Sequence, residues 1–247
     1  MTPLAPPPLA RGFSSGVSAA EARWRPGLAN ACRHSEIFAS SAEASGAGLA
    51  LSLALDARRA AASASGDDPD ERAWLWVQDK VARRLSGRPY YRGMPEPLRH
   101  RLIHVAAGSP EDALFALEEG LRCRELAFVI GEIAGNPRAL GLTASRRLSL
   151  AAEKHGVPLW LVRLDAKRDL GSARLRWEAR STPSARPRWD ANAPGAPAWE
   201  AELLRAHTHQ PGRWRLEESG VGSARILRQV QDERALFGNG LPNIRSA

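Results

Sequence analysis

The sequence predicts an α/β protein with a doubly wound, mostly parallel sheet and a small β-rich C-terminal extension. Short apolar runs alternate with helical periodicities from residue 36 to residue 163, as in repeated strand–helix–strand units. The run 126–130 contains adjacent β-branched residues and suits a strand buried on both faces. A single carboxylate, Glu132, follows it, and ligands of open α/β sheets bind at the carboxyl ends of such strands.

Composition limits the protein class. The 247 residues suffice for one large domain with extensions, and 43% of them are hydrophobic. The formal net charge of +8 favours acidic partners, nucleic acid first among them. Cys32 and Cys123 form neither a disulfide framework nor a metal-ligand spacing, which indicates free thiols in a reducing compartment. No apolar run reaches the ~18 residues of a membrane span, so we expect a cytoplasmic protein without membrane contact.

The chain divides into four predicted parts. Residues 1–33 are rich in proline, glycine and serine, and we expect a disordered, basic arm there. The α/β domain is expected over residues 34–182, with strands at 36–39, 74–77, 101–105, 126–130 and 159–163. Its helices are expected over 48–62, after the N-cap Ser109, and over 142–156.

The pattern changes after residue 163. Residues 172–179 alternate as an exposed or edge strand does, and residues 183–197 form a proline-rich linker. Residues 199–204 are a short amphipathic piece, and 213–216 suit a further strand. We therefore predict a linker with a strand and helix extension over 183–218, and a disordered tail over 219–247.

The loop after the first predicted strand resembles a phosphate-binding turn that lacks its reactive groups. Such a turn reads Gly-x-x-x-x-Gly-Lys-Ser/Thr, where the lysine reaches phosphate and the hydroxyl holds magnesium. Here Ser41 occupies the first glycine position and Gly46 the second, with Ser45 just before it. Ala47 replaces the lysine and Gly48 replaces the hydroxyl. Phosphoryl transfer depends on those groups, so we expect no ATPase activity, no catalytic residue and no cofactor.

Glu132 has two interpretations. It is either a variant of the acid that closes a Walker B strand, or a structural carboxylate that caps a loop or pairs with Arg146 or Arg147. Two arginines near a helix N-terminus oppose the helix dipole, which suggests this ion pair, an acidic partner or a solvated face. Because the phosphate-binding loop is incomplete, we favour the ion pair.

Basic and aromatic residues gather in the C-terminal half, where residues 160–216 contain 11 lysines and arginines and 6 acids. Arginines beside Trp177 and Trp214 suit backbone contact and base stacking on single-stranded DNA. Alternatively, the tryptophans fill a small core and the arginines stay solvated. His207 and His209 have no accompanying ligand cluster, so we expect no metal. The candidate partner or DNA contacts are Arg146, Arg147, Arg163, Arg174, Arg176, Trp177, Arg213, Trp214 and Arg215.

Seven blocks in a fixed order carry a family resemblance. They are residues 34–38 (HSEIF), 76–79 (WVQD), 113–123 (ALFALEEGLRC), 129–132 (VIGE), 142–152 (LTASRRLSLAA), 172–177 (SARLRW) and 211–214 (PGRW). Over about residues 34–216 the chain resembles the ImuA proteins of bacterial mutagenesis cassettes. It departs from the family pattern after Glu218, so no partner contact is assigned to its tail.

The resemblance implies a RecA-like fold with a degenerate Walker A loop, and a role in the SOS response. ImuA proteins act in translesion synthesis with ImuB, a Y-family-like protein without polymerase activity, and with an error-prone DNA polymerase. We therefore predict a non-enzymatic adaptor in such a complex. A single-stranded DNA-binding module acting through residues 163–216 is the alternative, and an ATPase with a divergent loop is a third hypothesis. RecA and a second copy of the chain are further candidate partners.

Overall fold

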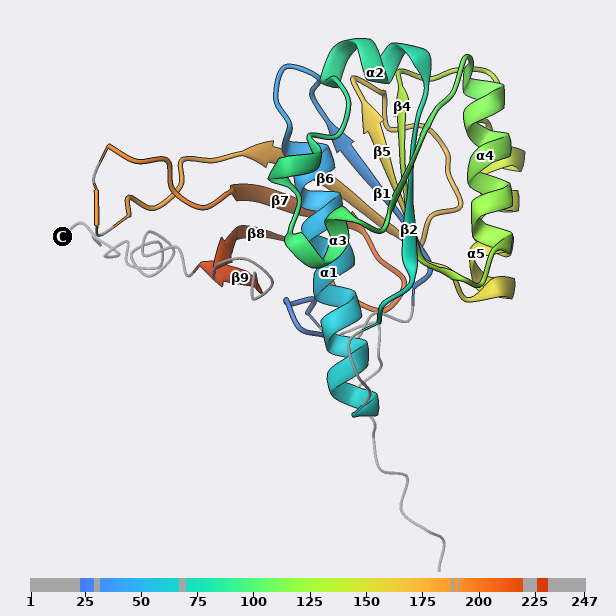
Figure 1. Cartoon of the computed structure of the whole chain (residues 1–247). Helices are drawn as coiled ribbons and strands as arrows, with labels where there is room; N and C mark the ends of the chain where they lie inside the picture. Colours follow the sequence, from blue (N-terminus) through green and yellow to red (C-terminus); the bar gives the residue numbers. More distant parts are fainter. Residues whose placement is uncertain are drawn as a thin grey trace, which may run out of the picture.

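The computed structural model describes residues 23–28, 32–66, 70–187, 189–190, 192–219 and 226–230. These residues form one sheet in the order β3-β2-β4-β5-β1-β6-β7-β8-β9 (Figure 1). The strands are β1 His34–Ala39, β2 Ala73–Gln78, β3 Leu102–Ala106, β4 Leu126–Ala134, β5 Leu159–Leu164, β6 Leu175–Ser181, β7 Ala198–Arg205, β8 Gly212–Ser219 and β9 Ile226–Val230. The helices are α1 Ser45–Ser65, α2 Lys80–Ser86, α3 Glu96–Arg99, α4 Pro110–Arg122 and α5 Leu142–His155, with a 3-10 turn, η2, at Tyr91–Gly93.

The sheet is mostly parallel. Neighbouring strands run parallel from β3 to β6, with His34 opposite Leu159 and Gln78 opposite Glu132. The pairs β6–β7, β7–β8 and β8–β9 are antiparallel. This mixed sheet is compatible with a doubly wound fold, and the predicted α/β class with a mostly parallel sheet is confirmed.

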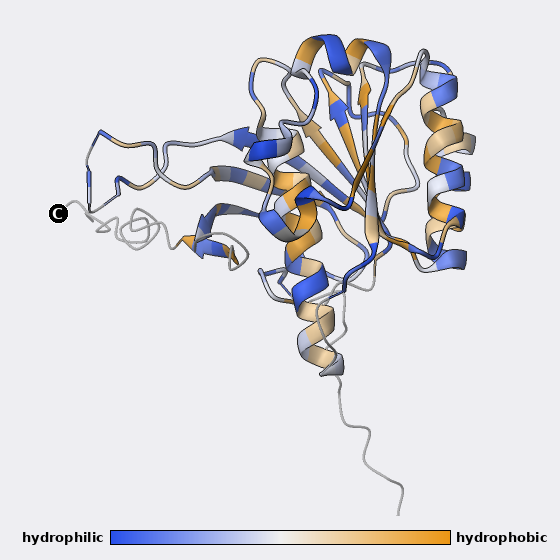
Figure 2. Ribbon diagram, in the orientation of Figure 1, coloured by the Kyte–Doolittle hydropathy of each residue, from blue (hydrophilic) through white to orange (hydrophobic). Residues whose placement is uncertain are grey.

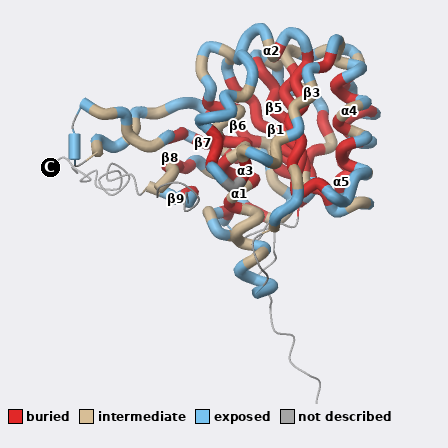
Figure 3. Tube along the Cα trace, viewed as in Figure 1, coloured by how far each residue is buried: buried red, intermediate tan, exposed pale blue. Residues whose placement is uncertain are grey.

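Helices cover both faces of the parallel part. Helix α1 packs on one face, and α4 and α5 pack on the other (Figure 1). Alternation along β4 sends Phe128 and Ile130 toward α1, and Val129 and Ile133 toward α4 and α5. Hydrophobic residues therefore occur on successive positions of the central strands (Figure 2), and these strands are buried (Figure 3).

The predicted helix ends agree with the structure at two sites. The Ser109 hydroxyl accepts a hydrogen bond from the Asp112 amide at 3.1 Å and caps α4. Gly156 ends α5 at φ 73°, and its amide donates to the Ala152 carbonyl at 2.9 Å. Helix α1 begins at Ser45, three residues before the predicted start.

Two predictions for the C-terminal half were wrong: that residues 172–179 form an edge strand, and that the extension over 183–218 contains a helix. Strand β6 is no edge strand, because it lies between β1 and β7. Residues 199–204 belong to strand β7, whose inward residues Trp199, Ala201 and Leu203 join the core under α1. Strand β8 contains the predicted segment 213–216, and the described part of 183–218 holds strands and no helix.

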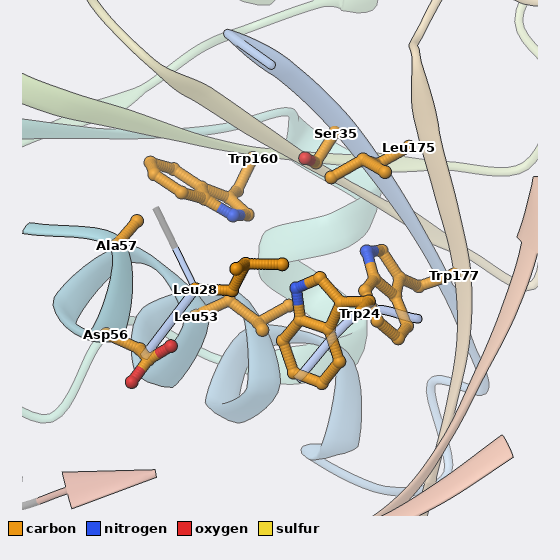
Figure 4. A pocket seen from close by; sticks show the side chains of 9 residues that line it. All are labelled: Trp24, Leu28, Ser35, Leu53, Asp56, Ala57, Trp160, Leu175 and Trp177. Atoms are coloured by element: carbon orange, nitrogen blue, oxygen red, sulfur yellow. The ribbon is translucent and has the colours of Figure 1, made fainter. Parts of the chain in front are cut away.

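The chain begins to pack before residue 34. Trp24 is 4% exposed, and its ring lies 4.8 Å from the Trp177 ring and 5.5 Å from the Trp214 ring. Around it, Leu28, Leu53 and Trp160 line a residual cavity of about 10 Å³, on the order of one water molecule (Figure 4). Residues 23–28 are therefore part of the fold rather than of a loose arm. The rest of the arm before residue 23, and the tail apart from Ser219 and β9, lie outside the described residues.

No helix in the described segments combines the length and apolar character needed to cross a membrane.

Candidate functional site

The carboxyl ends of β2 and β4 are one place where this topology could hold a ligand. The connection after β2 leads outward to β3, whereas the connection after β4 leads the other way to β5. Strands whose connections diverge in this way leave a crevice at their carboxyl ends. Helix α2 fills this crevice. The Asp79 carboxylate caps it by accepting from the Ala82 amide at 2.6 Å, and it also accepts from the Ala134 amide at 3.1 Å.

Glu132 lies under α2 and holds it in place. Its carboxylate accepts hydrogen bonds from the Trp76 indole at 2.7 Å and from the Ser86 hydroxyl at 2.8 Å. Burial raises the pKa of Glu132, and hydrogen bonds from Ser86, Gln78 and Trp76 oppose the rise. The carboxylate thus joins β2, β4 and the end of α2.

The predicted ion pair between Glu132 and Arg146 or Arg147 is wrong. Glu132 points to the face of the sheet that carries Trp76 and α1, whereas α5 lies on the opposite face. Arg147 instead pairs with Glu118 of α4 at 2.7 Å. Arg146 is exposed and makes no ion pair among the described residues. Because side chains alternate along β4 and α5 packs on the face opposite α1, the two groups lie on opposite faces of the sheet.

The loop between β1 and α1 is held by acidic side chains of the protein itself. The Ser41 amide donates to the Asp165 carboxylate at 2.9 Å, and hydrogen bonds from Ser41 lower the pKa of Asp165. The Glu43 carboxylate accepts from the Ser181 amide at 2.7 Å and from the Ser181 hydroxyl. The Ser45 hydroxyl donates to the Ala179 carbonyl at 3.3 Å. The loop is thereby tied to the start of the β5–β6 connection and to β6.

The two glycines in the first turn of α1, Gly46 and Gly48, are explained by close packing. A Cβ atom on Gly46 would lie 2.7 Å from the Cβ of Ala39 and 2.8 Å from a methyl group of Val162. A Cβ atom on Gly48 would lie 3.1 Å from the ring of Trp199. Ala47, between them, packs against the core. Both glycines therefore allow α1 to approach the sheet closely.

A pocket of about 370 Å³ opens beside this loop. Its charged lining residues are Glu43, Asp165, Glu178, Arg168 and Arg180. Both arginines pair with Glu178, Arg180 at 2.8 Å. An anionic ligand there would meet three carboxylates and two arginines that are already paired.

Two of the candidate DNA contacts, the buried Arg163 and the largely buried Arg176, belong to a charge network inside the protein. Arg163 is 1% exposed and lies 3.4 Å from Glu36 and 3.4 Å from Asp169. The Arg176 guanidinium donates to Glu36 at 2.8 Å. Glu36 itself is fully buried on β1. These two arginines join β1, β5 and β6 to the β5–β6 connection rather than facing a partner.

The proposed stacking of bases on Trp177 and Trp214 is contradicted by burial. The rings are 1% and 2% exposed and form a cluster with Trp24. Arg174 pairs with Glu153 at 2.8 Å, and Arg213 pairs with Glu202 at 2.8 Å. Arg215 donates to the Pro183 carbonyl at 2.6 Å. The interpretation of the tryptophans as core residues is the one that the structure supports.

His34 gives the fold a dependence on pH. Its Nδ1 lies 2.7 Å from the Ser149 hydroxyl, and burial, with a smaller contribution from the Arg176 charge, lowers its pKa to about 3. An unfolded histidine titrates near 6.5, so stability is full above pH 6.5 and declines as pH falls toward 3. We expect a loss of about 2 kcal/mol between pH 6.5 and 5 from this group alone.

Urea unfolding of the wild type and of His34→Asn at several pH values tests this expectation. The asparagine can keep a hydrogen bond to Ser149 but does not titrate. The variant should lack most of the decline above pH 5, where carboxylates contribute little. An equal decline in both proteins would contradict the assignment to His34.

Sequence analysis missed two groups of residues. Trp24 was included in the disordered arm, although a tryptophan within a proline-rich and serine-rich stretch was a usable signal. Residues 80–101 contain seven lysines and arginines, one acid and two adjacent tyrosines. This segment is shorter than residues 160–216, and its excess of cations over acids is larger, six against five. No group of three or more possible metal ligands occurs among the residues that the structure describes.

Comparison with known proteins gives one consistent relationship. No protein-family model matches the chain. Two curated proteins of Caulobacter vibrioides, from strains NA1000 / CB15N and ATCC 19089 / CIP 103742 / CB 15, are each named Protein ImuA. Each is 35% identical over an alignment of 146 positions that covers 53% of this chain and 58% of the relative. The match thus spans little more than half the length of these relatives. With the seven ordered blocks, they support assignment of this chain to the ImuA family.

Proposed function

We propose that this protein is a non-catalytic, RecA-like accessory protein of an error-prone translesion synthesis complex, in which it acts as an adaptor. Its partners in this proposal are an ImuB-like protein and an error-prone DNA polymerase, under control of the SOS response. The family relationship supports the mutagenesis role. The mostly parallel sheet, whose first strand leads through a short loop into a helix with two glycines in its first turn, supports the RecA-like part.

The non-catalytic part of the proposal rests on one observation: the β1–α1 loop is held by hydrogen bonds to the carboxylates of Asp165 and Glu43. In a phosphate-binding turn, free backbone amides and a lysine receive the phosphates. Here the Ser41 amide is taken by Asp165, Glu43 is held nearby by Ser181, and Ala47 stands in the lysine position. Phosphate would have to displace a carboxylate and would then lack a cation to balance it. In this proposal the loop is a degenerate Walker A sequence whose role is structural, because it connects β1 and α1 to β6 and to the β5–β6 connection.

The experiment combines association and turnover. The purified chain and the ImuB-like protein of the same organism are mixed and analysed by size-exclusion chromatography, with and without ATP and magnesium. We expect a complex in both conditions, with the same retention volume, and no ATP turnover above background. Failure to associate, or turnover that is lost in Glu132→Gln, would overturn the proposal.

Binding of single-stranded DNA through residues 163–216 is not favoured as a second function. The two tryptophans that would stack on bases are buried, and Arg163, Arg174, Arg176 and Arg213 are paired with acids.

A further inference from the structure

A second basic region of the chain has no part in the adaptor proposal. Residues 80–101 hold an excess of six cations over anions, against a net charge of +8 for the whole protein. They form α2 at the carboxyl end of β2, and then η2 and α3, which lead back along the α1 face of the sheet to the start of the edge strand β3 (Figure 1). We call this region the α2 surface and define it by Lys80, Arg83, Arg84, Arg88, Tyr90 and Arg92.

The cations of the α2 surface are not neutralised by the protein. Arg83 is half-buried and the other four are exposed, and none of the five makes an ion pair with a described residue. Several exposed arginines elsewhere are paired, as Arg122 is with Glu119 and Arg213 is with Glu202. Unpaired cations at this density repel one another, and an external polyanion would relieve that repulsion.

Hydrogen bonds from the sheet hold the α2 surface in a fixed shape. The Gln78 amide donates to the Gly87 carbonyl at 2.8 Å, and its oxygen lies 2.9 Å from Nε2 of His104 on β3. Ser86 is fixed by its hydrogen bond to Glu132. Arg83 and Arg88 both lie close enough to His104 to contribute, after burial, to lowering its pKa.

Aromatic rings stand beside these cations. The Tyr90 side chain is 72% exposed and Tyr91 is 43% exposed. The Tyr91 hydroxyl lies 2.8 Å from Nδ1 of His100. A Cβ atom on Gly93 would lie 3.0 Å from the Tyr90 ring, so a glycine there lets that ring rest against the turn. Most of the Tyr90 surface remains exposed to solvent.

We propose that the α2 surface binds single-stranded nucleic acid, with Lys80, Arg84, Arg88 and Arg92 on the phosphates and Tyr90 stacked on a base. Basic residues with interleaved exposed rings are the usual means of holding single strands without regard to sequence. An acidic peptide would use the same charges but would gain little from an exposed ring. This binding does not depend on the adaptor role, since it requires neither the ImuB-like protein nor the β1–α1 loop.

The test measures fluorescence anisotropy of labelled oligo-dT of about 20 nucleotides with the full chain at several salt concentrations. The triple variant Arg84→Gln/Arg88→Gln/Arg92→Gln should bind at least tenfold more weakly at low salt. It should also reduce the slope of log affinity against log salt by about 2, since each lost phosphate contact on a single strand contributes about 0.7. Tyr90→Ala should weaken binding roughly 5- to 100-fold with the slope unchanged, and Tyr90→Phe should bind like the wild type.

The matched control removes the same charge elsewhere, through Arg122→Gln/Arg146→Gln/Arg213→Gln. These three arginines are exposed on α4, α5 and β8. The control should retain affinity within about twofold of the wild type. The inference is overturned if the wild type does not bind at low salt, or if the control loses as much affinity as the triple variant. Competition by poly-glutamate as effective as that by unlabelled oligo-dT, with Tyr90→Ala binding DNA normally, would identify an acidic protein ligand instead and also overturn it.

Discussion

Trp24→Ala should lower the free energy of unfolding by about 3–5 kcal/mol, because it empties a buried tryptophan site. The Trp24 ring meets Trp177 and Trp214 edge-on, and the Arg23 guanidinium lies 5.1 Å from the centre of the Trp214 ring. The Gly27 amide also donates to the Asp56 carboxylate on α1 at 2.8 Å. Loss of the ring leaves a cavity between α1, β6 and β8 that these rigid elements cannot collapse to fill.

Denaturant unfolding followed by tryptophan fluorescence and circular dichroism measures this loss. Trp189→Ala is the matched control, because Trp189 is 80% exposed. The control should change stability by no more than about 0.5 kcal/mol. If both variants unfold at the same denaturant concentration, residues 23–28 do not contribute to the fold in solution.

Glu36→Gln should cost about 3–5 kcal/mol, because it removes the buried carboxylate shared by two arginines. Arg163 and Arg176 approach Glu36 at 3.4 Å and 2.8 Å, and both guanidinium groups also lie within 4 Å of Asp169. Asp169 is 34% exposed and provides weaker compensation through solvent. The variant therefore keeps two charged groups in a protein interior with a single, partly solvated partner.

The control for this change is Glu119→Gln on α4. Glu119 pairs with Arg122, and both side chains are about half exposed. Such a surface pair contributes between about 0 and 1 kcal/mol. Thermal melts of the two variants should therefore differ by several degrees, with Glu36→Gln lower. Equal melting temperatures would show that the network is solvated.

The parallel half of the fold was predictable because each of its elements has a local signal. The apolar run 126–130 belongs to β4, and the cap residues Ser109 and Gly156 lie where the sequence indicates. β-branched residues, N-caps and glycine C-caps act through the backbone within a few residues. Their effects are therefore visible without tertiary structure.

The C-terminal half and the candidate site depended on contacts distant in sequence. Apolar and polar residues alternate along β6, as they do in an edge strand. In the structure β6 nevertheless pairs on both sides, antiparallel with β7 and parallel with β1. The partner of Glu132 was chosen by charge alone, although the true partners, Trp76 and Ser86, are neutral donors. Arg146 and Arg147 are excluded by the face of the sheet on which α5 packs, which is a property of the tertiary structure. The pairing of Arg163 with Glu36, 127 residues earlier, had no sequence signal.

The docking of residues 23–28 also has a consequence for the order of events during synthesis. Trp24 is synthesised before its neighbours Trp177 and Trp214, which are added to the chain roughly 150 and 190 residues later. At typical rates of about 5–20 residues per second, the tryptophan waits on the order of ten seconds or more without its site. During that time its ring is an exposed apolar group on a growing chain, a natural target for a chaperone that binds nascent segments. Its burial then requires β8, the strand that carries Trp214, to be in place.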